Sequence, residues 1–594
     1  MRDLFEKPYS IFLETAKQDG ENQKTFLFQS PQSLIEAKSL SEVHLALERM
    51  EMAHRRGKWL AGYISYEAGF AFEKKLKQMP IRTSLPLLWF GEYDEPLLNP
   101  LVQFNRQSSI VQRVAFNVSK EDYASAIAKI LAYIEAGDVY QVNFTGKLSF
   151  DFQGNAVELY ETLRQKQAVA YAAFLNLGKQ AILSFSPELF FRIKDGVIES
   201  KPMKGTASRG RTNAEDETIA TWLKSDEKNR AENLMILDLI RNDFGRICKI
   251  GTVTVPSLFD VERLQTLLQM TSTVRGELKE GITFREIFEA IFPCGSITGA
   301  PKIRAMEIIS ELEAEPRGVY TGAIGYISPQ KETCFSVAIR TLVVEQKSAS
   351  SLVGEMGIGS GITIESKSQT EYEECLLKAK FLTTPIENFA LIESMKFDRH
   401  YCLLEKHLAR LKNSARYFDF QFDEEGLRAC LAKYAQTLDR SATYKVRLEL
   451  EKSGQIKLSC ERIEPTSGIG AVAIAKIRTN SADKFFYHKT TERQTYDEAT
   501  VLARQLGLAD FIFLNERDEV SEGAISNVFV EKAGRLYTPP ISSGILAGIY
   551  RQHILETVSN ASERILHIDD LKNAERIWIC NAVRGIREVK LVEV

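Results

Sequence analysis

The chain has 594 residues, of which 44% are hydrophobic and 26% are charged, and its formal net charge is -3. These values are typical of globular proteins, and they exclude collagen-like, coiled-coil and intrinsically disordered chains. Because Lys and Arg are spread along a nearly neutral chain, nothing indicates nucleic-acid binding.

The sequence shows neither a targeting segment nor a membrane segment. Charges interrupt the apolar windows of residues 1–18, and no run of about 18 apolar residues occurs. The 8 cysteines are scattered singly, without the paired spacing of zinc sites. We therefore expect a cytoplasmic protein without membrane contact, whose thiols are reduced and mostly buried.

Residues 115–380 alternate between strand-like and helical patterns. Helical periodicity occurs at 121–137 and 231–247, and strand-like runs occur at 180–193 and 333–344. This alternation predicts a large α+β unit.

A linker is predicted near residue 385. A helical pattern at 371–382 is followed by the stretch TTPIEN at 383–388, after which a new strand-like run begins. We therefore predict one domain over residues 1–384 and a second over residues 385–594.

The second part has a mixed pattern of helices and strands. In chain order we expect a helix at 400–418, strands at 444–451, 456–463 and 470–477, a helix at 496–507, a strand at 510–515, a hairpin at 527–540 and a helix from Arg551.

Several charged residues of the first part need an explanation. Glu371, Glu374 and Lys378 share one helix face, which on its own favours a solvent-exposed charged stripe. Glu232 opens a segment that is apolar nearly all round, so its carboxylate is expected to be buried and to need a partner, for which a metal ion is one candidate. Lys204 lies among small, turn-forming residues in KPMKGT, where the backbone can approach a ligand closely.

These stretches form part of a series of motifs that resembles the chorismate-utilising enzymes, a family that includes anthranilate synthase, isochorismate and salicylate synthases, and aminodeoxychorismate synthase component I. The motifs are, in order, IEAGDVYQVNF, SPELFF, PMKGTASRGRT, DEKNRAENLMILDLIRNDFGRI, FPCGSITGAPK, YTGAIGYISP, FSVAIRT and GSGITIESKSQTEYEECLLKAK. The resemblance implies a large chorismate-binding α/β sandwich domain.

The resemblance also implies a metal site and a general acid. In this family Mg²⁺ is held by glutamates matching Glu232 and Glu374, with Glu371 close by, and it binds the ring carboxylate of chorismate. A hard cation with oxygen ligands suits that task. Glu188 matches the general acid that protonates the departing C4 hydroxyl, which requires a raised pKa.

Other residues are expected to contact the substrate. Arg340 resembles the arginine that clamps a carboxylate through its planar pair of donors, and Lys378 is expected to assist it. Gln141, Gly205 and Thr206 are expected to line the same pocket.

Two positions separate the branches of this family. Gln141 stands where isochorismate-forming members carry a water-activating lysine, so addition of hydroxide is not expected. Lys204 stands where anthranilate synthases carry alanine, and a lysine here marks aminodeoxychorismate synthases, in which its amine attacks C2 before ammonia adds at C4. The alternative is an ammonium that only binds the substrate. Gln269 departs from the histidine found in many relatives.

The ammonia requires a separate source. A glutaminase needs an activated cysteine in a tight turn with a histidine, and none of the 8 cysteines has that setting. The resemblance therefore implies a separate glutamine amidotransferase subunit, or free ammonia.

A second series of motifs resembles the fold-type IV pyridoxal phosphate enzymes, which include branched-chain and D-amino acid aminotransferases and aminodeoxychorismate lyase. The motifs lie at 407–411, 487–499, 518–530, 536–551 and 581–586. This resemblance implies a two-subdomain, branched-chain aminotransferase-like fold, pyridoxal 5'-phosphate as cofactor and, by analogy, a homodimer formed through this domain.

Lys489 matches the lysine that forms a Schiff base with the cofactor, and Glu522 matches the carboxylate that keeps the pyridine nitrogen protonated. The phosphate is expected at the helix opened by Gly548–Ile549, where backbone amides and the helix dipole favour an anion. Arg410 resembles a phosphate-binding arginine, and Asn527 is expected to orient the cofactor.

Together the two resemblances imply a bifunctional enzyme of 4-aminobenzoate and folate synthesis. The first domain would aminate chorismate at C4, and the second would eliminate pyruvate from 4-amino-4-deoxychorismate. The motifs of the second domain do not separate a lyase from a transaminase, and only the fusion favours the lyase. Two alternatives remain, namely an anthranilate synthase component I fused to an aminotransferase, and a catalytically silent scaffold.

Overall fold

The computed structural model describes residues 5, 7–17, 22–79, 81, 83–100, 102, 109–348, 351–385, 387–464 and 468–594. Ile386 of the predicted linker lies outside this set. The chain divides into two compact units. The first comprises Met1–Ser208 and Ala220–Glu387, and the second comprises Arg209–Ile219 and Asn388–Val594.

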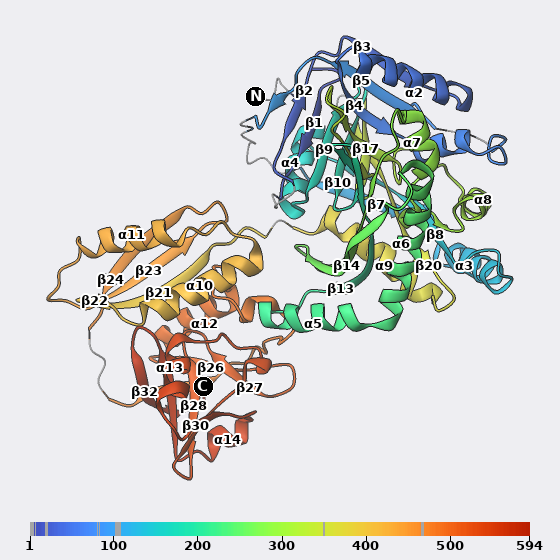
Figure 1. The fold of residues 1–594 in the computed structure, drawn as a ribbon. Coiled ribbons are helices and arrows are strands. Elements are labelled where there is room, and N and C mark those ends of the chain that lie inside the picture. Colours follow the sequence, from blue (N-terminus) through green and yellow to red (C-terminus); the bar gives the residue numbers. More distant parts are fainter. Residues whose placement is uncertain are drawn as a thin grey trace. The chain divides into compact units, whose positions relative to one another are not determined.

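Two large antiparallel sheets form the first unit (Figure 1). Over the described residues, sheet one contains β1 (Ile11–Glu14), β2 (Phe26–Phe28), β6 (Leu97–Leu98), β7 (Val111–Phe116), β8 (Gln141–Phe152), β9 (Tyr171–Asn176), β10 (Gln180–Ser186), β16 (Gly299–Ala300), β19 (Thr341–Ser348) and β20 (Ser351–Ile362). Sheet two contains β3 (Ser33–Ala37), β4 (Trp59–Ile64), β5 (Leu88–Tyr93), β11 (Leu189–Lys194), β12 (Val197–Lys201), β13 (Met203–Ser208), β14 (Thr254–Arg263), β15 (Leu267–Glu277), β17 (Ala323–Ile327) and β18 (Thr333–Val337).

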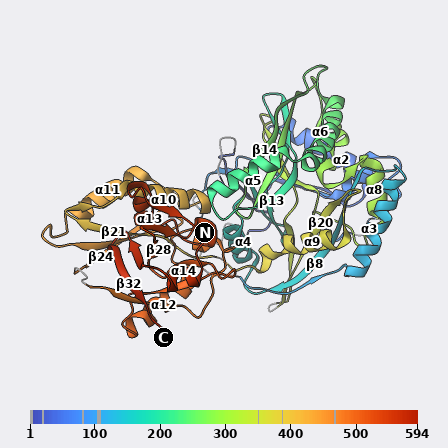
Figure 2. The same ribbon diagram turned by 90° about the horizontal axis from the view of Figure 1, so that it is seen from below.

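The two sheets pack against each other, because one buried cluster contains Phe28 and Leu175 of sheet one together with Tyr63 and Trp89 of sheet two. Helices cover the outer faces, so the predicted α/β sandwich is confirmed (Figure 2). They are α2 (Leu40–Arg55), α3 (Lys120–Glu135), α4 (Ala156–Lys166), α6 (Glu227–Ile247), α7 (Phe284–Ile291), α8 (Lys302–Leu312) and α9 (Ser368–Thr383), with short 3₁₀ helices at η1 (Tyr66–Phe72) and η2 (Gly295–Ile297). The further helix α5 (Asn213–Ser225) begins in the Arg209–Ile219 segment of the second unit.

Helix starts follow local capping. The side chain of Ser119 accepts from the amide of Asp122 at the start of α3, and that of Asp226 accepts from the amide of Asn229 at the start of α6. Helix α6 therefore begins before residue 231, where the apolar pattern placed its start. Glu232 is half-buried and Leu234 on this helix is 40% exposed, so the expectation of a buried segment at this position holds only in part.

Two strand-like runs of the sequence cross from one sheet to the other. The run at 180–193 divides into β10 and β11, because Pro187 has no N–H for a ladder and Glu188 follows it. The run at 333–344 also divides, into β18 and β19, although no proline lies between them and Arg340 occupies the crossing. The two crossings are hydrogen-bonded to each other, since the amide of Phe185 donates to the Arg340 carbonyl and that of Val337 donates to the Glu188 carbonyl, both at 3.1 Å.

The second unit contains two sheets with separate cores, as its predicted two-subdomain fold requires. One consists of β21 (Leu391–Asp398), β22 (His400–Tyr401), β23 (Tyr444–Leu450) and β24 (Ile456–Arg462), with α10 (Leu404–Phe418) and α11 (Glu424–Ala435) sharing its core. The other consists of β25 (Gly470–Ile474), β26 (Asp510–Leu514), β27 (Val520–Gly523), β28 (Asn527–Lys532), β29 (Arg535–Thr538), β30 (Ala561–Glu563), β31 (Arg576–Asn581) and β32 (Gly585–Leu591). The remaining elements are η3 (Lys484–Phe486), α12 (Gln494–Gln505), η4 (Ile541–Ser543), α13 (Ile549–Thr557) and α14 (Ile568–Lys572).

The expected hairpin at 527–540 is confirmed as the antiparallel pair β28 and β29. Among the described residues, no helix combines the length and the apolar character that crossing a membrane would require.

Candidate functional site

Three polar side chains of the first unit converge on the backbone of Gly361. A Cβ atom built on this glycine would lie 2.3 Å from Nε2 of Gln141, 2.7 Å from Oδ1 of Asn143 and 3.1 Å from Nζ of Lys204. Gln141 and Asn143 come from the start of β8, Gly361 from the end of β20, and Lys204 from β13 of the other sheet. The structure thus brings together Gln141 and Lys204, the two positions expected from the sequence to separate the branches of the family, and adds Asn143.

Sequence reasoning missed Asn143, although it lies two residues after Gln141 and so on the same face of a strand. Its amide donates to the carbonyl oxygen of Ser296 at 2.6 Å, and Nε2 of Gln141 donates to Oδ1 of Asn143 at 3.0 Å.

Lys204 lies in a field of mixed charge. Burial lowers the pKa of its ammonium, and nearby carboxylates partly oppose that shift. The charged groups that act on it are Glu232, Glu188, Lys378 and Glu374. Five of the predicted site residues are therefore close enough to interact, and burial favours the neutral, nucleophilic amine.

Glu188 is a buried carboxyl group at the strand crossing. It is 3% exposed, and burial raises its pKa to about 7. The hydroxyl of Ser296 donates to Oε1 of Glu188 at 2.6 Å. Ser296 was not singled out from the sequence, where a serine next to glycine resembles an ordinary turn. At neutral pH a large fraction of Glu188 keeps its proton, as a general acid must.

Arg340 occupies the second crossing with a left-handed backbone, at φ 50°. Burial lowers the pKa of its guanidinium to about 10, and in the part of the chain that the structure describes no acidic side chain pairs with it. A partly buried cation of this kind suits a carboxylate of a ligand. Lys378 differs, because it is exposed and its Nζ contacts Glu374 at 2.6 Å and the carbonyl of Gly359 at 2.8 Å.

The three predicted metal ligands do not form a closed ligand set. Burial raises the pKa of Glu232, and the charge of Glu371 raises it further, so these two carboxylates repel each other. Glu371 accepts from the hydroxyl of Ser366 at 2.8 Å, whereas Glu374 pairs with Lys378. Over the described residues no group of three or more His, Cys, Asp or Glu side chains is arranged to hold a metal. The repulsion is nevertheless of the kind that a divalent cation relieves.

Gly205 and Thr206 lie on β13 directly after Lys204. Gly205 is buried and has a φ of +91°, a conformation that favours glycine. Nε2 of Gln269 donates to the Gly205 carbonyl at 3.0 Å, and the Thr206 hydroxyl donates to Oε1 of Gln269 at 3.1 Å. Gln269 therefore stabilises β13, the strand that carries Lys204, through hydrogen bonds to the two residues after it.

The second unit contains the candidate cofactor site. Burial lowers the pKa of Lys489 to about 7, with further lowering by Arg493 and Arg410, while Glu393 and Glu522 oppose it. Burial raises the pKa of Glu522 to about 8. Glu522 is 4% exposed and accepts hydrogen bonds from the Tyr496 hydroxyl at 3.2 Å, the Asn527 amide at 2.9 Å and the Leu546 N–H at 3.1 Å.

The other predicted cofactor residues are grouped near the start of α13. Gly548 precedes Ile549, the first residue of that helix, and a Cβ on Gly548 would lie 1.8 Å from Oδ1 of Asn527. Arg410 donates through Nη1 to the carbonyl of Ala547 at 3.2 Å. Asn527 orients Glu522 and the Leu546 carbonyl, to which it donates at 3.1 Å.

Sequence reasoning missed Glu393 and His407. The 2% exposed Glu393 binds Nε and Nη2 of Arg410 at 2.9 and 2.7 Å and faces Nδ1 of His407 at 2.6 Å. A glutamate directly after the two apolar residues that begin a strand, Leu391 and Ile392, indicates a buried charge that needs partners. The buried Nε2 of His407 has no hydrogen-bond partner among the described residues.

Comparison with known proteins decides the family. Residues 8–384 match the family described as chorismate binding enzyme. The chain belongs to this family. Residues 390–592 match the family described as amino-transferase class IV, so this chorismate-binding enzyme is fused to a class IV aminotransferase-like unit.

Relatives of two kinds match the first unit about equally well. A probable chloroplastic aminodeoxychorismate synthase of Oryza sativa is 38% identical over 328 residues, covering 52% of this chain and 36% of the relative. Anthranilate synthase component 1 of Aquifex aeolicus is 40% identical over 271 residues, covering 46% of this chain and 54% of the relative. The chain thus spans about half or less of the length of these relatives.

Among solved structures, anthranilate synthase component I from Streptococcus pneumoniae aligns with a TM-score of 0.55 and 25% identity, covering 62% of this chain and 94% of that one. This similarity supports the chorismate-binding fold of the first unit.

Proposed function

We propose that the chain is a bifunctional enzyme that aminates chorismate at C4 and then converts 4-amino-4-deoxychorismate into 4-aminobenzoate and pyruvate. The observation that carries the proposal is the position of Lys204, whose amine lies beside Gln141 and Asn143 at Gly361. The names of the relatives do not separate amination at C4 from amination at C2, because both kinds match at similar identity. The proposal separates them by Lys204, which the resemblance places where anthranilate synthases carry alanine.

In the first reaction Lys204 acts as the nucleophile. Its neutral amine attacks C2 while Glu188 gives its proton to the departing C4 hydroxyl, which leaves as water. Ammonia then forms a bond to C4 and the bond from C2 to Lys204 breaks, which restores the amine. The pKa shifts of Lys204 and Glu188 both support these roles, since burial favours the uncharged form of each group.

Charge neutralisation is the proposed role of the glutamates. Glu232 and Glu374, with Glu371, would hold Mg²⁺, and Glu374 would have to exchange its contact with Lys378 for the cation. The cation would offset the repulsion between Glu232 and Glu371 and attract a substrate carboxylate. The half-buried guanidinium of Arg340 would bind a second carboxylate.

In the second reaction the class IV unit would use pyridoxal 5'-phosphate. When bound, this cofactor supplies a positively charged ring that withdraws electrons from the substrate carbon next to the amine. The buried, raised-pKa Glu522 suits a ring N–H, because a cation against it would offset its burial. Arg410 and the helix start at Gly548–Ile549 suit the phosphate.

Lys489 is the proposed cofactor lysine and proton carrier. With its pKa lowered to about 7, it can take the C4 proton near neutral pH. Pyruvate then leaves from C3 and the ring becomes aromatic. This assignment rests on the fusion, because a transaminase would begin with the same proton transfer.

Further features of the proposal concern partners and location. Ammonia would come from a separate glutamine amidotransferase subunit. Dimerisation through the second unit and a cytoplasmic location remain predictions.

Lys204→Ala tests the first activity against its rival, an anthranilate synthase. Lys201→Ala is the matched control, because Lys201 lies on β12 of the same sheet, which β15 separates from β13, and pairs with Glu262. With chorismate, Mg²⁺ and an ammonium salt but no pyridoxal phosphate, we expect 4-amino-4-deoxychorismate to accumulate. Lys204→Ala should reduce this rate by at least about 100-fold, and Lys201→Ala should leave it nearly unchanged. Anthranilate as the product would contradict the proposal.

A further inference from the structure

Residues Arg209–Ile219 belong to the second unit, although they fall within the sequence range that matches the chorismate-binding family. They follow β13 and include the first turns of α5. Their partners in the second unit are the C-terminal half of α10 and the stretch 481–488, which ends directly before Lys489.

A buried ion pair gives this segment its shape. Nη2 of Arg209 contacts Oδ2 of Asp216 at 2.7 Å, and the two side chains are 7% and 6% exposed. The amide of Gly210 donates to Oδ1 of Asp216 at 2.8 Å. The guanidinium of Arg209 lies 4.4 Å from the centre of the Tyr417 ring. The segment is therefore folded into a turn whose basic end packs on an aromatic side chain of α10.

Two carbonyl oxygens of the segment accept hydrogen bonds from buried side chains. The Tyr417 hydroxyl donates to Gly210 at 2.6 Å, and His488 contacts the Arg211 carbonyl through Nε2 at 3.0 Å. The Tyr417 and His488 rings stack with centres 4.4 Å apart. Nδ1 of His488 lies 2.9 Å from the hydroxyl of Ser414.

These contacts determine the tautomer of His488. A carbonyl oxygen only accepts, so Nε2 carries the hydrogen and Nδ1 accepts from Ser414. Burial lowers the pKa of His488 to about 4, which keeps the ring neutral and this pattern intact at neutral pH.

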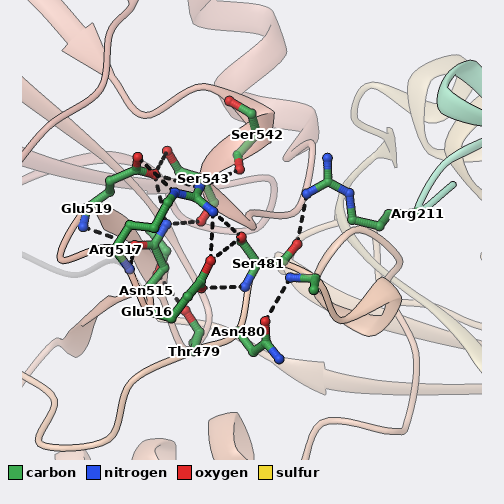
Figure 3. A network of polar contacts seen from close by, with 12 residues as sticks. Arg211, Thr479, Asn480, Ser481, Asn515, Glu516, Arg517, Glu519, Ser542 and Ser543 are labelled. Atoms are coloured by element: carbon green, nitrogen blue, oxygen red, sulfur yellow. Dashed lines mark hydrogen bonds and ion pairs between the residues drawn. The ribbon is translucent and has the colours of Figure 1, made fainter. Parts of the chain in front are cut away.

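The side chain of Arg211 adds a second attachment. Its Nη1 donates to the Ser481 carbonyl at 2.9 Å and to the Tyr487 hydroxyl oxygen at 2.6 Å. Ser481 is itself held by Glu516, to which its N–H and hydroxyl donate at 2.7 and 2.6 Å, and Arg517 extends this network (Figure 3). The segment thus forms hydrogen bonds at both ends of the stretch 481–488, which leads to Lys489.

The backbone at Lys489 is held on its other flank by a strand. The amide of Ile392 on β21 donates to the carbonyl of Lys489 at 2.9 Å, and the amide of Thr491 donates to the carbonyl of Ala390 at 2.9 Å. The backbone of Lys489 is therefore held on one side by β21. On the other side it is joined to His488, whose side chain donates to the carbonyl of Arg211.

We propose that Arg209–Ile219 is a positioning segment of the second catalytic unit, whose carbonyl oxygens at Gly210 and Arg211 hold Tyr417 and His488 and thereby the backbone of Lys489. The inference rests on the proposed role of Lys489 as the cofactor lysine. Without the segment, the buried hydroxyl of Tyr417 and imidazole of His488 would lose these acceptors. The class IV unit is thus incomplete without residues from the chorismate-binding range of the sequence.

Paired substitutions at His488 in the full-length protein test the proposal. His488→Gln places an amide N–H where Nε2 was and can still reach the Arg211 carbonyl, whereas the shorter side chain of His488→Asn reaches only the Nδ1 position near Ser414. Tyr417→Phe removes only the hydroxyl that binds Gly210. His400→Asn is the control, because His400 is an exposed histidine of the same unit.

The readouts are the dissociation constant of pyridoxal phosphate, the position of its protein-bound absorbance band and the unfolding temperature of the apoprotein. We expect His488→Asn to bind about tenfold more weakly with a shifted band, and Tyr417→Phe about threefold more weakly. His488→Gln and His400→Asn should stay within about twofold of the unsubstituted protein.

The outcomes separate this inference from the proposed function. A normal band and unaltered affinity in His488→Asn and Tyr417→Phe would overturn the inference alone. If His488→Asn does not fold, Tyr417→Phe decides, and unaltered cofactor binding in it would overturn the inference. Failure of the unsubstituted protein to bind pyridoxal phosphate would overturn the proposed function and this inference with it.

Discussion

The hydroxyl of Ser296 donates a hydrogen bond of 2.6 Å to Oε1 of Glu188. This bond stabilises the ionised carboxylate, whereas burial stabilises the protonated acid, and burial is the larger effect because the pKa is raised to about 7. Burial therefore sets the pKa of Glu188 well above its ordinary value, and the Ser296 contact lowers it by part of that shift.

Ser296→Ala should raise the pKa of Glu188 above about 7, because it removes a donor that favours the ionised form. The proposed amination requires protonated Glu188, so its rate should fall as pH rises through that pKa, and the variant should show this fall at higher pH. The measurement is the pH dependence of kcat with chorismate and ammonia in excess. Ser65→Ala, which removes a buried hydroxyl bound to the Pro86 carbonyl, is the control. An unshifted profile in Ser296→Ala would argue against Glu188 as the acid.

Gly361→Ala should slow the first reaction while leaving the fold largely intact. The added methyl group would meet the ends of three side chains, Gln141, Asn143 and Lys204, which can move aside. We expect a loss of at least about tenfold in kcat/KM, because displacement of about 1 Å at the nucleophile is costly. The unfolding temperature should change little.

The contrasting variant is Gly359→Ala on the same strand. Its methyl group would lie 2.4 Å from the backbone carbonyl of Phe144, which cannot move freely. This variant should lose about 1–3 kcal/mol of stability from overpacking. Equal loss of stability in the two variants would contradict the convergence of side chains at Gly361.

Glu522→Gln should stabilise the apoprotein at alkaline pH. Folding raises the pKa of Glu522 from 4.5 to about 8, so between these values the folded state binds more protons than the unfolded state and stability falls as pH rises. Glutamine cannot ionise, so the variant should unfold at a higher temperature than the parent at about pH 8 and at a similar temperature at about pH 5.

Added pyridoxal phosphate should reverse that order at about pH 8, because a ring N–H would favour the carboxylate of the parent. Glu556→Gln, at an exposed glutamate of α13, controls for loss of charge. If pyridoxal phosphate stabilised Glu522→Gln as much as the parent, Glu522 would not contact the ring nitrogen.

Lys489→Ala should separate the two activities. The proposed function places amination in the first unit, so 4-amino-4-deoxychorismate should accumulate at the normal rate while formation of 4-aminobenzoate and pyruvate falls by at least about 1,000-fold. Chromatography of the products measures both. The exposed Lys476 supplies the control variant Lys476→Ala. Continued release of pyruvate by Lys489→Ala would show that another group performs the elimination.

Much of the candidate site could be predicted from motifs, since the structure brings Glu188, Lys204, Glu232, Glu374 and Lys378 into one electrostatic field. The strand crossings could not be predicted. Periodicity describes the run at 180–193 as one strand, and only the pairing with different neighbours shows that it changes sheets at Glu188.

Contacts between distant segments were also beyond the sequence. The sequence around Ser296, Glu393 and His407 does not show which residues they contact. Ser296 binds Glu188 and His407 contacts Glu393, and both contacts join different segments of the chain. The segment Arg209–Ile219 has the same character, because its motif resembles the chorismate family while its contacts lie in the second unit. Sequence spacing reports neighbours along the chain, whereas these groups are joined by tertiary packing.

The central claim is tested most directly by product analysis of the purified full-length protein with chorismate, Mg²⁺, pyridoxal phosphate and an ammonium salt at mildly alkaline pH. The account predicts 4-aminobenzoate and pyruvate in equal amounts, with 4-amino-4-deoxychorismate accumulating when pyridoxal phosphate is left out. Anthranilate or isochorismate as the product would contradict the roles assigned to Lys204 and Gln141.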